Sequence, residues 1–555
     1  MIHPDQWHAV DGLVLEPNAM IAVTTSDENV VVAAGPGAGK TELLAQRADF
    51  LLRTGQCPYP RRILAVSFKV DAARNLRNRV RRRSVPNFAA RFDSFTFHAF
   101  AKRLIDNFRP ALTGYNALNA DYRIDPDTPG TRIEGEQITL GDLVPLASEV
   151  VESNVYACGG VRQTYSHVFL DEFQDCTWQQ YQLIKAAFGE TSAVLTAVGD
   201  IKQRIMAWAG ALEGVLQTFA DDFSARPLSL YQNFRSAPRL RRMQNRMIAQ
   251  MDPDAVSPPE DLVGDTGVIE VLDFDTEYDE AHAVSNFVDD WLNEGVAPSE
   301  IAILVRQQPH LVAAALGNDL ADRGIPFRNE QESQDLTTEP VAALVFNFIR
   351  VIADDRQPDA YAELMRIATR SSASEDEASR FDSRLKRMLR KTRATVRESK
   401  FKTEDSAAWR SLVQEFLQLV SRPVLTALSP GYQQGTRLND LIEQAFEAFE
   451  RELAVDENAV QALRRLSEVD AIRFLTIHKC KGLEFEKVVV LGVEEELFWG
   501  DPTAAMSEFF VAISRTKQHL VLTHASHRDR PAGAAKRWDE WRTPHQEFLN
   551  FADDE

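Results

Sequence analysis

The stretch GPGAGKTE, from Gly35 to Glu42, spaces glycines, a lysine and a threonine in a way that suits phosphate chemistry. The pattern gives a loop whose backbone N–H groups can surround phosphates, with Lys40 reaching the terminal phosphates and the Thr41 hydroxyl on Mg²⁺. A glycine-rich turn without a ligand is the alternative, but the apolar run before the loop and the helical run after it favour phosphate binding. The sequence therefore predicts a nucleotide site formed by Gly35, Gly37, Ala38, Gly39, Lys40, Thr41 and Glu42.

Two adjacent carboxylates, Asp171 and Glu172, follow the apolar run HVFL. At the end of a strand, Asp171 can hold Mg²⁺ through its water shell, while Glu172 orients or deprotonates an attacking water. Adjacent acids in an acidic chain are more often solvated surface. Their position downstream of the phosphate-binding loop favours the second half of the same site.

The stretch VGDIKQRIMAWAGA, from Val198 to Ala211, carries Gln203 and, five residues later, Trp208. An amide can sense the charge of a phosphate, whereas an indole can stack on a base. An isolated aromatic residue is more often part of the core, so Trp208 gains a functional interpretation only from the motifs around it.

The elements that must position these residues alternate between short apolar runs and helical stretches. Candidate strands in the N-terminal half are NVVVAAG, RRILAVSF, HVFLDE and SAVLTAVGD, and later ones are GVIEVLDF, IAILVR, IRFLTI, KVVVLGV and HLVLTHA. This alternation predicts an α/β fold with parallel sheets. A mostly helical region at 336–469 divides the second set, and a smaller insertion covers 112–164.

Composition sets limits on the partners of this 555-residue chain. Its net charge of −20 disfavours nucleic-acid binding, yet three runs rich in Lys and Arg lie near 74–83, 235–246 and 380–402. Each run is ordinarily a solvated helix face, and together they are compatible with a positively charged path. Four cysteines without paired spacing, no signal peptide and no apolar run of about 18 residues predict a cytoplasmic protein without a membrane span.

The ordered stretches DEFQD, VGDIKQRIMAWAGA, LYQNFRSAPRL, FLTIHKCKGLEFEKVVVLGVEEELF and FFVAISRTK resemble the motifs of superfamily 1A helicases of the UvrD, Rep and PcrA kind. The resemblance extends from about Leu15 to Ala525. It implies two RecA-like domains with parallel sheets, each carrying a mainly helical insertion, and ATP between the two domains. It also implies Mg²⁺ dependence and 3′ to 5′ translocation on single-stranded DNA. The implied domains are 1A at 1–111 and 165–235, a 1B-like insertion at 112–164, 2A at 236–335 and 470–555, and a helical 2B-like insertion at 336–469.

The resemblance also implies roles for individual side chains in ATP hydrolysis. Gln203 would touch the γ-phosphate, and Arg235 and Arg515 would meet it from the second domain, with Glu172 as the remaining catalytic residue. Fixed guanidinium groups can stabilise the charge on the transferring phosphoryl group. Phe234 would stack on adenine, and Glu484 would hold the ribose.

The same resemblance implies a DNA-facing set comprising Phe68, Thr96, His98, Trp208 and His478. Stacking of bases on aromatic rings holds a strand without regard to sequence. The alternative is that Phe68 and Trp208 are core residues and that both histidines are buried and satisfied.

Several positions depart from the family pattern. Met206 and Ala209 stand where the family has an aromatic residue and an arginine, and Lys69 and Val70 replace the usual threonine and asparagine. Ala19 stands where a glutamine would read adenine, so GTP remains an alternative substrate.

Two function classes remain open from the sequence. The first is a motor that moves on DNA and separates strands; the second is a DNA-responsive regulatory ATPase that controls a partner nuclease with little unwinding of its own. The first insertion is small, and the chain continues only briefly after AISRTK. In this the sequence resembles the helicase subunit of the Gabija anti-phage system, so a separate nuclease and a role in phage defence or DNA repair are expectations. A P-loop enzyme acting on small molecules is a third class, in which nucleic acid would not change ATP turnover.

Overall fold

The computed structural model describes residues 1–68, 70–125, 130–203, 211–230, 232–329, 336, 339–354, 357–370, 375–398, 400–429, 432, 437–466, 471–531, 534 and 538–553. The chain forms two compact units. The first comprises 1–280, 304–307 and 476–555, and the second comprises 281–303 and 308–475. The boundaries of the four implied domains stay a prediction.

The N-terminal sheet has six strands, and all of its neighbouring strands pair in parallel. Their order is β3 (Phe92–Thr96), β2 (Arg62–Ser67), β6 (Tyr165–Leu170), β7 (Val194–Gly199), β1 (Val30–Ala34) and β8 (Arg226–Leu230). The prediction of an α/β fold with parallel sheets is confirmed. The sequence patterns found four of these six strands and missed β3 and β8.

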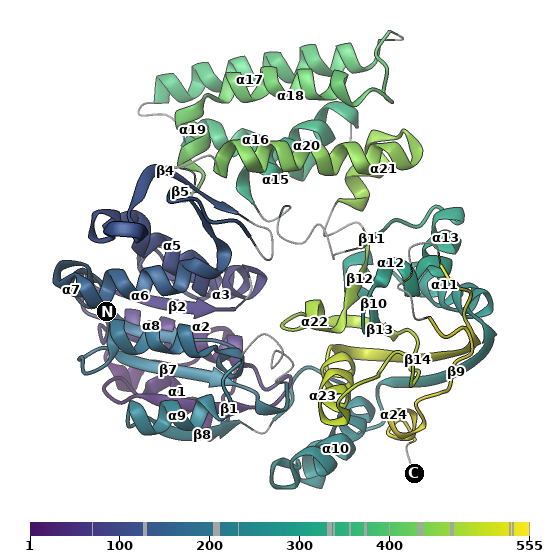
Figure 1. The fold of residues 1–555 in the computed structure, drawn as a ribbon, viewed down its shortest axis with the longest axis horizontal. Helices are drawn as coiled ribbons and strands as arrows, with labels where there is room; N and C mark the ends of the chain where they lie inside the picture. The colour runs from purple at the N-terminus through teal and green to yellow at the C-terminus, as the bar shows by residue number, and fades with distance from the viewer. Residues whose placement is uncertain are drawn as a thin grey trace. The chain divides into compact units, whose positions relative to one another are not determined.

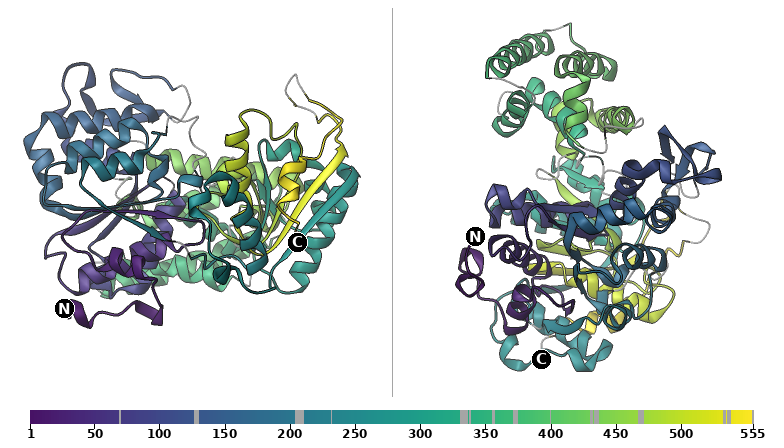
Figure 2. Two further views of the ribbon diagram at one scale, coloured as in Figure 1. Left: turned by 90° about the horizontal axis from the view of Figure 1, so that it is seen from below. Right: turned by 90° about the vertical axis from the view of Figure 1, so that its left-hand side faces the viewer.

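Helices cover both faces of this sheet, as the left view of Figure 2 shows. Val30 and Val32 of β1 pack in one core with α1 (Pro17–Thr24) and α2 (Lys40–Arg53). Val31 points into a second core with α5 (Phe97–Phe108), α6 (Leu143–Ser153) and α8 (Trp178–Phe188). Because successive side chains of a strand face opposite sides, a strand buried on both faces reads as a continuous apolar run such as VVVAA.

The predicted chemistry lies where these parallel strands end. The phosphate-binding loop follows β1, Asp171 follows β6, and Gln203 lies in a short 3₁₀ turn after β7. Carboxyl ends of parallel strands lie along one edge of a sheet, which is where open α/β sheets bind ligands. The topology therefore brings three separate stretches of sequence to one edge.

Residues 112–164 differ in part from the expected mainly helical insertion. They contain a two-stranded sheet of β4 (Leu118–Asp125) and β5 (Gly135–Thr139), followed by α6 and by α7 (Val155–Thr164). Val150 of α6 and Val161 of α7 belong to the core of the N-terminal sheet. These helices therefore help to build the layer that supports the site.

The second sheet also has six strands, in the order β11 (Phe327–Asn329), β12 (Ile472–Thr476), β10 (Ile301–Val305), β13 (Phe485–Val490), β14 (Thr516–His527) and β9 (Val268–Thr276). β11 pairs with β12, β13 with β14, and β14 with β9, each in parallel. The five predicted strands are present, and the three-residue strand β11 was missed.

Helices make up most of the second unit, where Figure 1 draws them in green. They are α15 (Pro340–Ala353), α16 (Pro358–Arg370), α17 (Glu375–Val396), α18 (Ser406–Val420), α19 (Arg422–Ala427), α20 (Arg437–Asp456) and α21 (Ala459–Arg465). Their core includes Phe348 and Phe416, whose rings stack with centroids 4.2 Å apart. Apolar residues at helical spacing thus form a core separate from those of the N-terminal sheet.

The remaining helices connect and cover the strands. They are α3 (Val70–Arg83), α4 (Pro86–Ala89), α9 (Val215–Asp222), α10 (Pro238–Met251), α11 (Glu277–Asn293), α12 (Pro309–Val312), α13 (Ala314–Asp322), α22 (Ile477–Cys480), α23 (Pro502–Ile513) and α24 (Gln546–Asn550). Among the described helices, none combines the length and apolar character that crossing a membrane requires.

A buried arginine joins the end of β14 to two other segments of the first unit. Arg528 is 1% exposed, and its guanidinium donates to Glu280 at 2.7 and 2.9 Å and to Glu494 at 2.8 Å. Burial lowers the pKa of Arg528, but the two carboxylates outweigh burial and raise it above its ordinary value. The ion pairs are therefore fully formed at any physiological pH.

Replacing this arginine should destabilise the first unit strongly. Arg528→Met leaves Glu280 and Glu494 buried beside fewer cations, so the free energy of unfolding should fall by about 3–5 kcal/mol. Urea denaturation followed by circular dichroism measures the loss. Arg530→Met, which changes an exposed arginine two residues away, should shift the same value by about 0.5 kcal/mol or less. Equal losses in both variants would contradict the structural role of Arg528.

Candidate functional site: a nucleotide pocket on the N-terminal sheet

The predicted phosphate-binding loop adopts a conformation that only glycine supports easily. Gly37 and Gly39 have φ of 71° and 77°, in the left-handed region. A Cβ at Gly37 would lie 2.1 Å from Asn233 Oδ1 and 2.9 Å from Arg235 Cβ. The backbone N–H of Phe234 also donates to the Gly37 carbonyl at 3.0 Å. The loop is therefore packed against the segment that carries Phe234 and Arg235.

Asp171 and Glu172 are held rigidly at the end of β6. Asp171 is 2% exposed, and its Oδ1 accepts from the Glu172 N–H at 3.0 Å. Glu172 has φ 53° and ψ 38°, a left-handed conformation that is uncommon for a residue with a side chain. Gln174 Nε2 donates to Glu172 Oε2 at 2.7 Å. Such strain persists only where the surroundings enforce it, and it often marks a functional position.

The two carboxylates differ in charge environment. Burial and the neighbouring charge of Glu172 raise the pKa of Asp171, with Lys40 opposing them. Burial also acts to raise the pKa of Glu172, but Lys40, Lys481 and Arg515 outweigh it, so that this pKa is lowered. Glu172 is therefore ionised at neutral pH, while Asp171 lies where a further cation would be favourable.

The residues expected to hold Mg²⁺ fit that role chemically. Thr41 lies in the first turn of α2, and Asp171 is a buried carboxylate beside a second one. Within the described ranges, no group of three or more His, Cys, Asp or Glu side chains is arranged to hold a metal. Mg²⁺ at nucleotide sites commonly takes one or two protein oxygens and completes its shell with phosphates and water. When bound there, Mg²⁺ neutralises charge on the phosphates.

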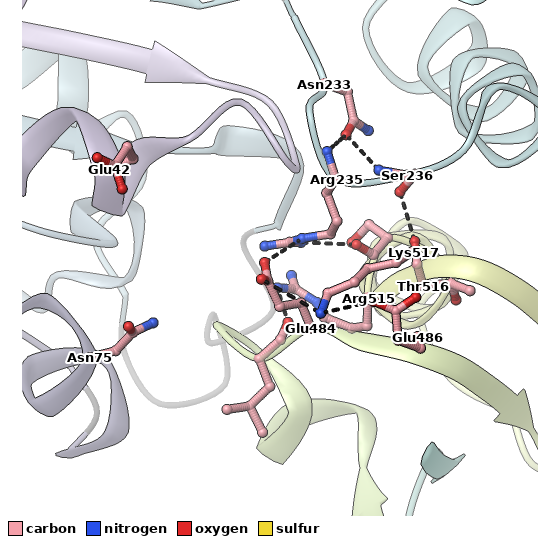
Figure 3. A network of polar contacts seen from close by, with 12 residues as sticks. Glu42, Asn75, Asn233, Arg235, Ser236, Glu484, Glu486, Arg515, Thr516 and Lys517 are labelled. Carbon is pink, nitrogen blue, oxygen red and sulfur yellow. Dashed lines mark hydrogen bonds and ion pairs between the residues drawn. The ribbon is translucent and has the colours of Figure 1, made fainter. Parts of the chain in front are cut away.

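Arg235 and Arg515 approach this site from the other side. Arg515 is 2% exposed, directly precedes β14, and donates to the side-chain oxygen of Gln203. Arg235 donates to Glu484 Oε2 and to the Ser514 carbonyl, each at 3.0 Å. Figure 3 shows the side chains of Arg235 and Glu484 meeting, with Arg515 beside them. The structure thus brings three of the four predicted catalytic residues together and places Arg235 next to them.

A buried ion pair that sequence reasoning missed completes the polar network. Lys481 Nζ lies 2.5 Å from Asp175 Oδ2, with the two side chains 3% and 4% exposed, and it also donates to the Gln203 carbonyl. Gln174, besides its contact with Glu172, accepts from the Asp200 N–H at 3.0 Å. One indication of these residues was present in the sequence, because the family-like stretches DEFQD and FLTIHKCKGLEFEKVVVLGVEEELF contain Gln174, Asp175 and Lys481. Lys481 and Asp175 are 306 residues apart in the sequence, so the spacing of residues within a motif could not predict that they pair.

The residues predicted to hold the nucleoside vary in availability. Phe234 is 64% exposed, so its ring is accessible for stacking. Glu484 is near the site but is engaged by Arg235, and Glu42 pairs with Arg79 at 3.1 Å and Arg83 at 3.0 Å. Ala19 is buried in α1 within the apolar core. The roles of these residues in nucleotide binding stay predictions.

Three of the predicted DNA contacts lie together at the ends of β2 and β3. Phe68 packs against Phe97 with ring centroids 5.1 Å apart, and the Thr96 hydroxyl accepts from the Ala99 N–H at 3.1 Å as the cap of α5. His98 is half-buried, and burial lowers its pKa. All three side chains therefore have structural contacts, and the assignment to DNA stays a prediction.

The other two predicted DNA contacts come from separate segments. His478 lies in α22, and its Nε2 is 3.5 Å from Glu508 Oε1. Trp208 lies outside the described residues, as do Met206 and Ala209.

In two of the three basic runs, some of the arginines bind other groups of the protein. Arg79 and Arg83 bind Glu42, while Arg242 donates to the Gly264 carbonyl and Arg246 to the Phe551 carbonyl. The third run covers α17, whose cations include the exposed Arg380, Arg384, Arg387 and Arg390. A continuous charged path along all three runs is therefore not supported by these contacts.

A cavity of about 210 Å³ borders the start of the phosphate-binding loop. It is lined by Gly35 and Pro36, by Asp200, and by residues of α10 and the segment that follows it. Residues 37–41 do not line it, so we do not place the triphosphate in this cavity.

The phosphate-binding loop, the two buried carboxylates and the two arginines lie near the ends of strands in parallel sheets. Together they define a nucleoside triphosphatase of the P-loop class. A family model described as an AAA domain matches residues 18–209, and one described as the UvrD-like helicase C-terminal domain matches 228–453 and 379–527. The chain belongs to the UvrD-like helicases of superfamily 1A and is an ATP-hydrolysing enzyme. The expectation from the motifs is thereby confirmed at the level of the family.

Named relatives cover most of this chain. It is 25% identical to DNA helicase II of Escherichia coli (strain K12), over 91% of this chain and 84% of that protein. It is 24% identical to the ATP-dependent DNA helicase PcrA of Bacillus subtilis (strain 168), over 93% and 83%. For PcrA of Leuconostoc citreum the identity is 25%, over 91% and 81%.

Removing the Lys481 ammonium should affect stability and turnover in separable ways. Lys481→Met leaves the Asp175 carboxylate buried without its cation, so the free energy of unfolding should fall by about 3–5 kcal/mol. In the double variant with Asp175→Asn, most of this loss should return, because no charge is then buried unpaired.

ATP turnover should stay at least about tenfold low in the double variant, since Lys481 also holds Gln203 and favours the ionised form of Glu172. Urea denaturation and steady-state hydrolysis measure the two effects. Full recovery of both would show that Lys481 is only a structural partner of Asp175.

Proposed function

We propose that this protein is a Mg²⁺-dependent ATPase that moves 3′ to 5′ on single-stranded DNA and separates duplex strands ahead of it. The observation that carries the proposal is the contact of Arg515 with Gln203 beside ionised Glu172. An arginine next to the C-terminal sheet thereby reaches the reacting end of a nucleotide on the N-terminal sheet. The names of the relatives support DNA as the substrate. The polarity rests on the resemblance of the motifs to those of superfamily 1A helicases.

Hydrolysis would use the site as follows. Backbone N–H groups of residues 35–39 and the Lys40 ammonium would bind the phosphates, while Thr41 and, through the water shell, Asp171 would hold Mg²⁺. The oxygen of a water attacks the γ-phosphorus, its proton passes to a Glu172 carboxylate oxygen, and the bond from phosphorus to the bridging oxygen breaks to leave ADP. Gln203 orients the reacting groups, and the arginines stabilise charge on the transferring phosphoryl group.

Arg235 and Glu484 would change partners when ATP binds. In the structure, Arg235 is held by the Glu484 carboxylate at 3.0 Å. A γ-phosphate offers the guanidinium a stronger, charge-assisted partner. Glu484 is then released to accept hydrogen bonds from the ribose hydroxyls, as the motif implies. Phe234 would stack on the base with its exposed ring.

Gln203 would couple ATP hydrolysis to the binding of DNA. Its side chain meets Arg515 and its carbonyl meets Lys481, which lies three residues after the predicted DNA contact His478. Trp208, the other predicted contact, follows Gln203 by five residues. Loss of the γ-phosphate would therefore move groups that are joined to both contacts by short stretches of chain.

A regulatory ATPase that controls a nuclease is the second candidate, because Met206 and Ala209 replace family residues beside Trp208. A separate nuclease partner, phage defence, DNA repair and a cytoplasmic location rest on sequence expectation and stay predictions. ATP is preferred to GTP in this proposal on the strength of the relatives' names.

Strand displacement tests the proposal directly. Wild-type protein with Mg²⁺ and ATP should displace a strand from duplex with a 3′ tail and not from duplex with a 5′ tail. Glu172→Gln should lower hydrolysis by about a hundredfold or more while retaining bound ATP, because the proton acceptor is lost and the phosphate contacts remain. Glu190→Gln is the matched control, since Glu190 shares the left-handed backbone but is exposed.

The outcomes separate the candidates. DNA-stimulated hydrolysis without displaced strand would favour the regulatory ATPase over the motor. Hydrolysis that nucleic acid does not change, or normal turnover by Glu172→Gln, would overturn the proposal altogether.

A further inference from the structure

We propose that Trp499 is a stacking platform for a base of the single strand, and that it acts near His478, to which Arg306 and Glu508 connect it. This inference rests on the proposed function, because it needs a nucleic-acid strand bound near α22. Trp499 is 62% exposed, although it lies in a loop whose neighbouring aromatic residue, Phe498, is 5% exposed. An exposed indole has the area and the flat faces to stack on one nucleic-acid base.

The backbone on either side of Trp499 is fixed by buried contacts. The N–H groups of Leu497 and Phe498 donate to the Glu494 carbonyl at 3.1 and 3.0 Å, and Glu494 is itself fully buried beside Arg528. Phe498 packs edge-on against Phe548, with ring centroids 5.3 Å apart. A ring on such a support loses little conformational freedom when a ligand stacks on it.

Arg306 holds the backbone of the Trp499 loop and contacts the Trp499 ring. This buried arginine donates to the carbonyls of Leu497 and Trp499 at 2.8 and 2.6 Å, and its guanidinium lies 5.4 Å from the centre of the Trp499 ring. Its Nε donates to Glu508 Oε2 at 2.5 Å. The Trp499 ring is therefore positioned by cation–π contact and by its own backbone, with most of its surface still exposed.

The same carboxylate connects Trp499 to the predicted DNA contact. Glu508 Oε1 lies 3.5 Å from His478 Nε2, while Glu508 Oε2 holds Arg306. A single buried side chain thus lies close to His478 and holds Arg306, which supports Trp499. A strand that touches His478 passes close to this shared anchor.

The chemistry of the surroundings favours a base over an apolar protein surface. Between 494 and 504, all of which the structure describes, Trp499 is the one exposed large apolar side chain. Gly500 and Asp501 follow it, and the Asp501 carboxylate accepts from the Ala504 N–H at 2.9 Å as the cap of α23. Within this stretch, one exposed aromatic ring lies near the exposed carboxylates of Glu495 and Asp501 and next to Gly500. One such ring offers the area of one base, whereas protein docking sites offer contiguous apolar area.

Affinity for single-stranded DNA tests this inference. Fluorescence anisotropy with a labelled oligothymidylate should give a Kd about fivefold higher or more for Trp499→Ala than for wild type, because a stacked base is lost. Trp499→Phe should bind within about threefold of wild type, since phenylalanine also stacks. Trp541→Ala is the matched control: Trp541 is 75% exposed and packs edge-on against His527 instead.

An abasic form of the same oligonucleotide distinguishes stacking from other contacts. Its affinity should be nearly equal for wild type and Trp499→Ala, because the missing base removes what the ring holds. An unchanged Kd for Trp499→Ala on the normal probe, or an equal loss on both probes, overturns the inference while wild-type binding leaves the proposed function intact. A change in self-association alone, measured by sedimentation, would assign the ring to protein docking and would also overturn it. Failure of wild type to bind the probe would instead defeat the proposed function.

Discussion

The balance of buried charge around Glu172 is the constraint on which the site depends. Asp171 and Asp175 are 2% and 5% exposed, and Glu172 lies between them in sequence. Burying carboxylates costs several kcal/mol each unless cations and hydrogen bonds compensate. Lys40 comes from α2 and Lys481 follows α22, so the balance requires segments that are far apart in sequence to stay together.

A nucleotide would shift this balance in a defined direction. A triphosphate would add negative charge next to Lys40, and the guanidinium groups of Arg515 and Arg235, which contact Gln203 and Glu484, lie in the same network. Fixed charges in a partly buried site act over short distances with little screening. The two arginines can therefore respond to the γ-phosphate, and each response alters a contact with a different segment of chain. In the proposed function, binding energy would in this way be converted into relative movement of segments.

Local chemistry was predictable from the sequence, whereas pairing across the chain was not. The phosphate-binding loop was found because its glycines and lysine lie within a few residues, and β1 because it is buried on both faces. β3 was missed because FDSFT mixes polar with apolar residues, and its burial is supplied by helices elsewhere. The Lys481–Asp175 pair and the engagement of Glu42 by α3 arise from tertiary packing, which no motif spacing encodes.

Several cations close to the site are held by carboxylates, and this limits how an acidic chain can attract nucleic acid. Arg306 is held by Glu508, Arg235 by Glu484, and Lys481 by Asp175. Such pairs fix the position of a cation but cancel much of its field, and a net charge of −20 adds repulsion toward phosphates at long range. Because the electrostatic attraction to phosphates is weak, the stacking of bases on aromatic rings must supply the affinity for a single strand. An exposed indole on a rigid loop supplies such stacking without any uncompensated positive charge.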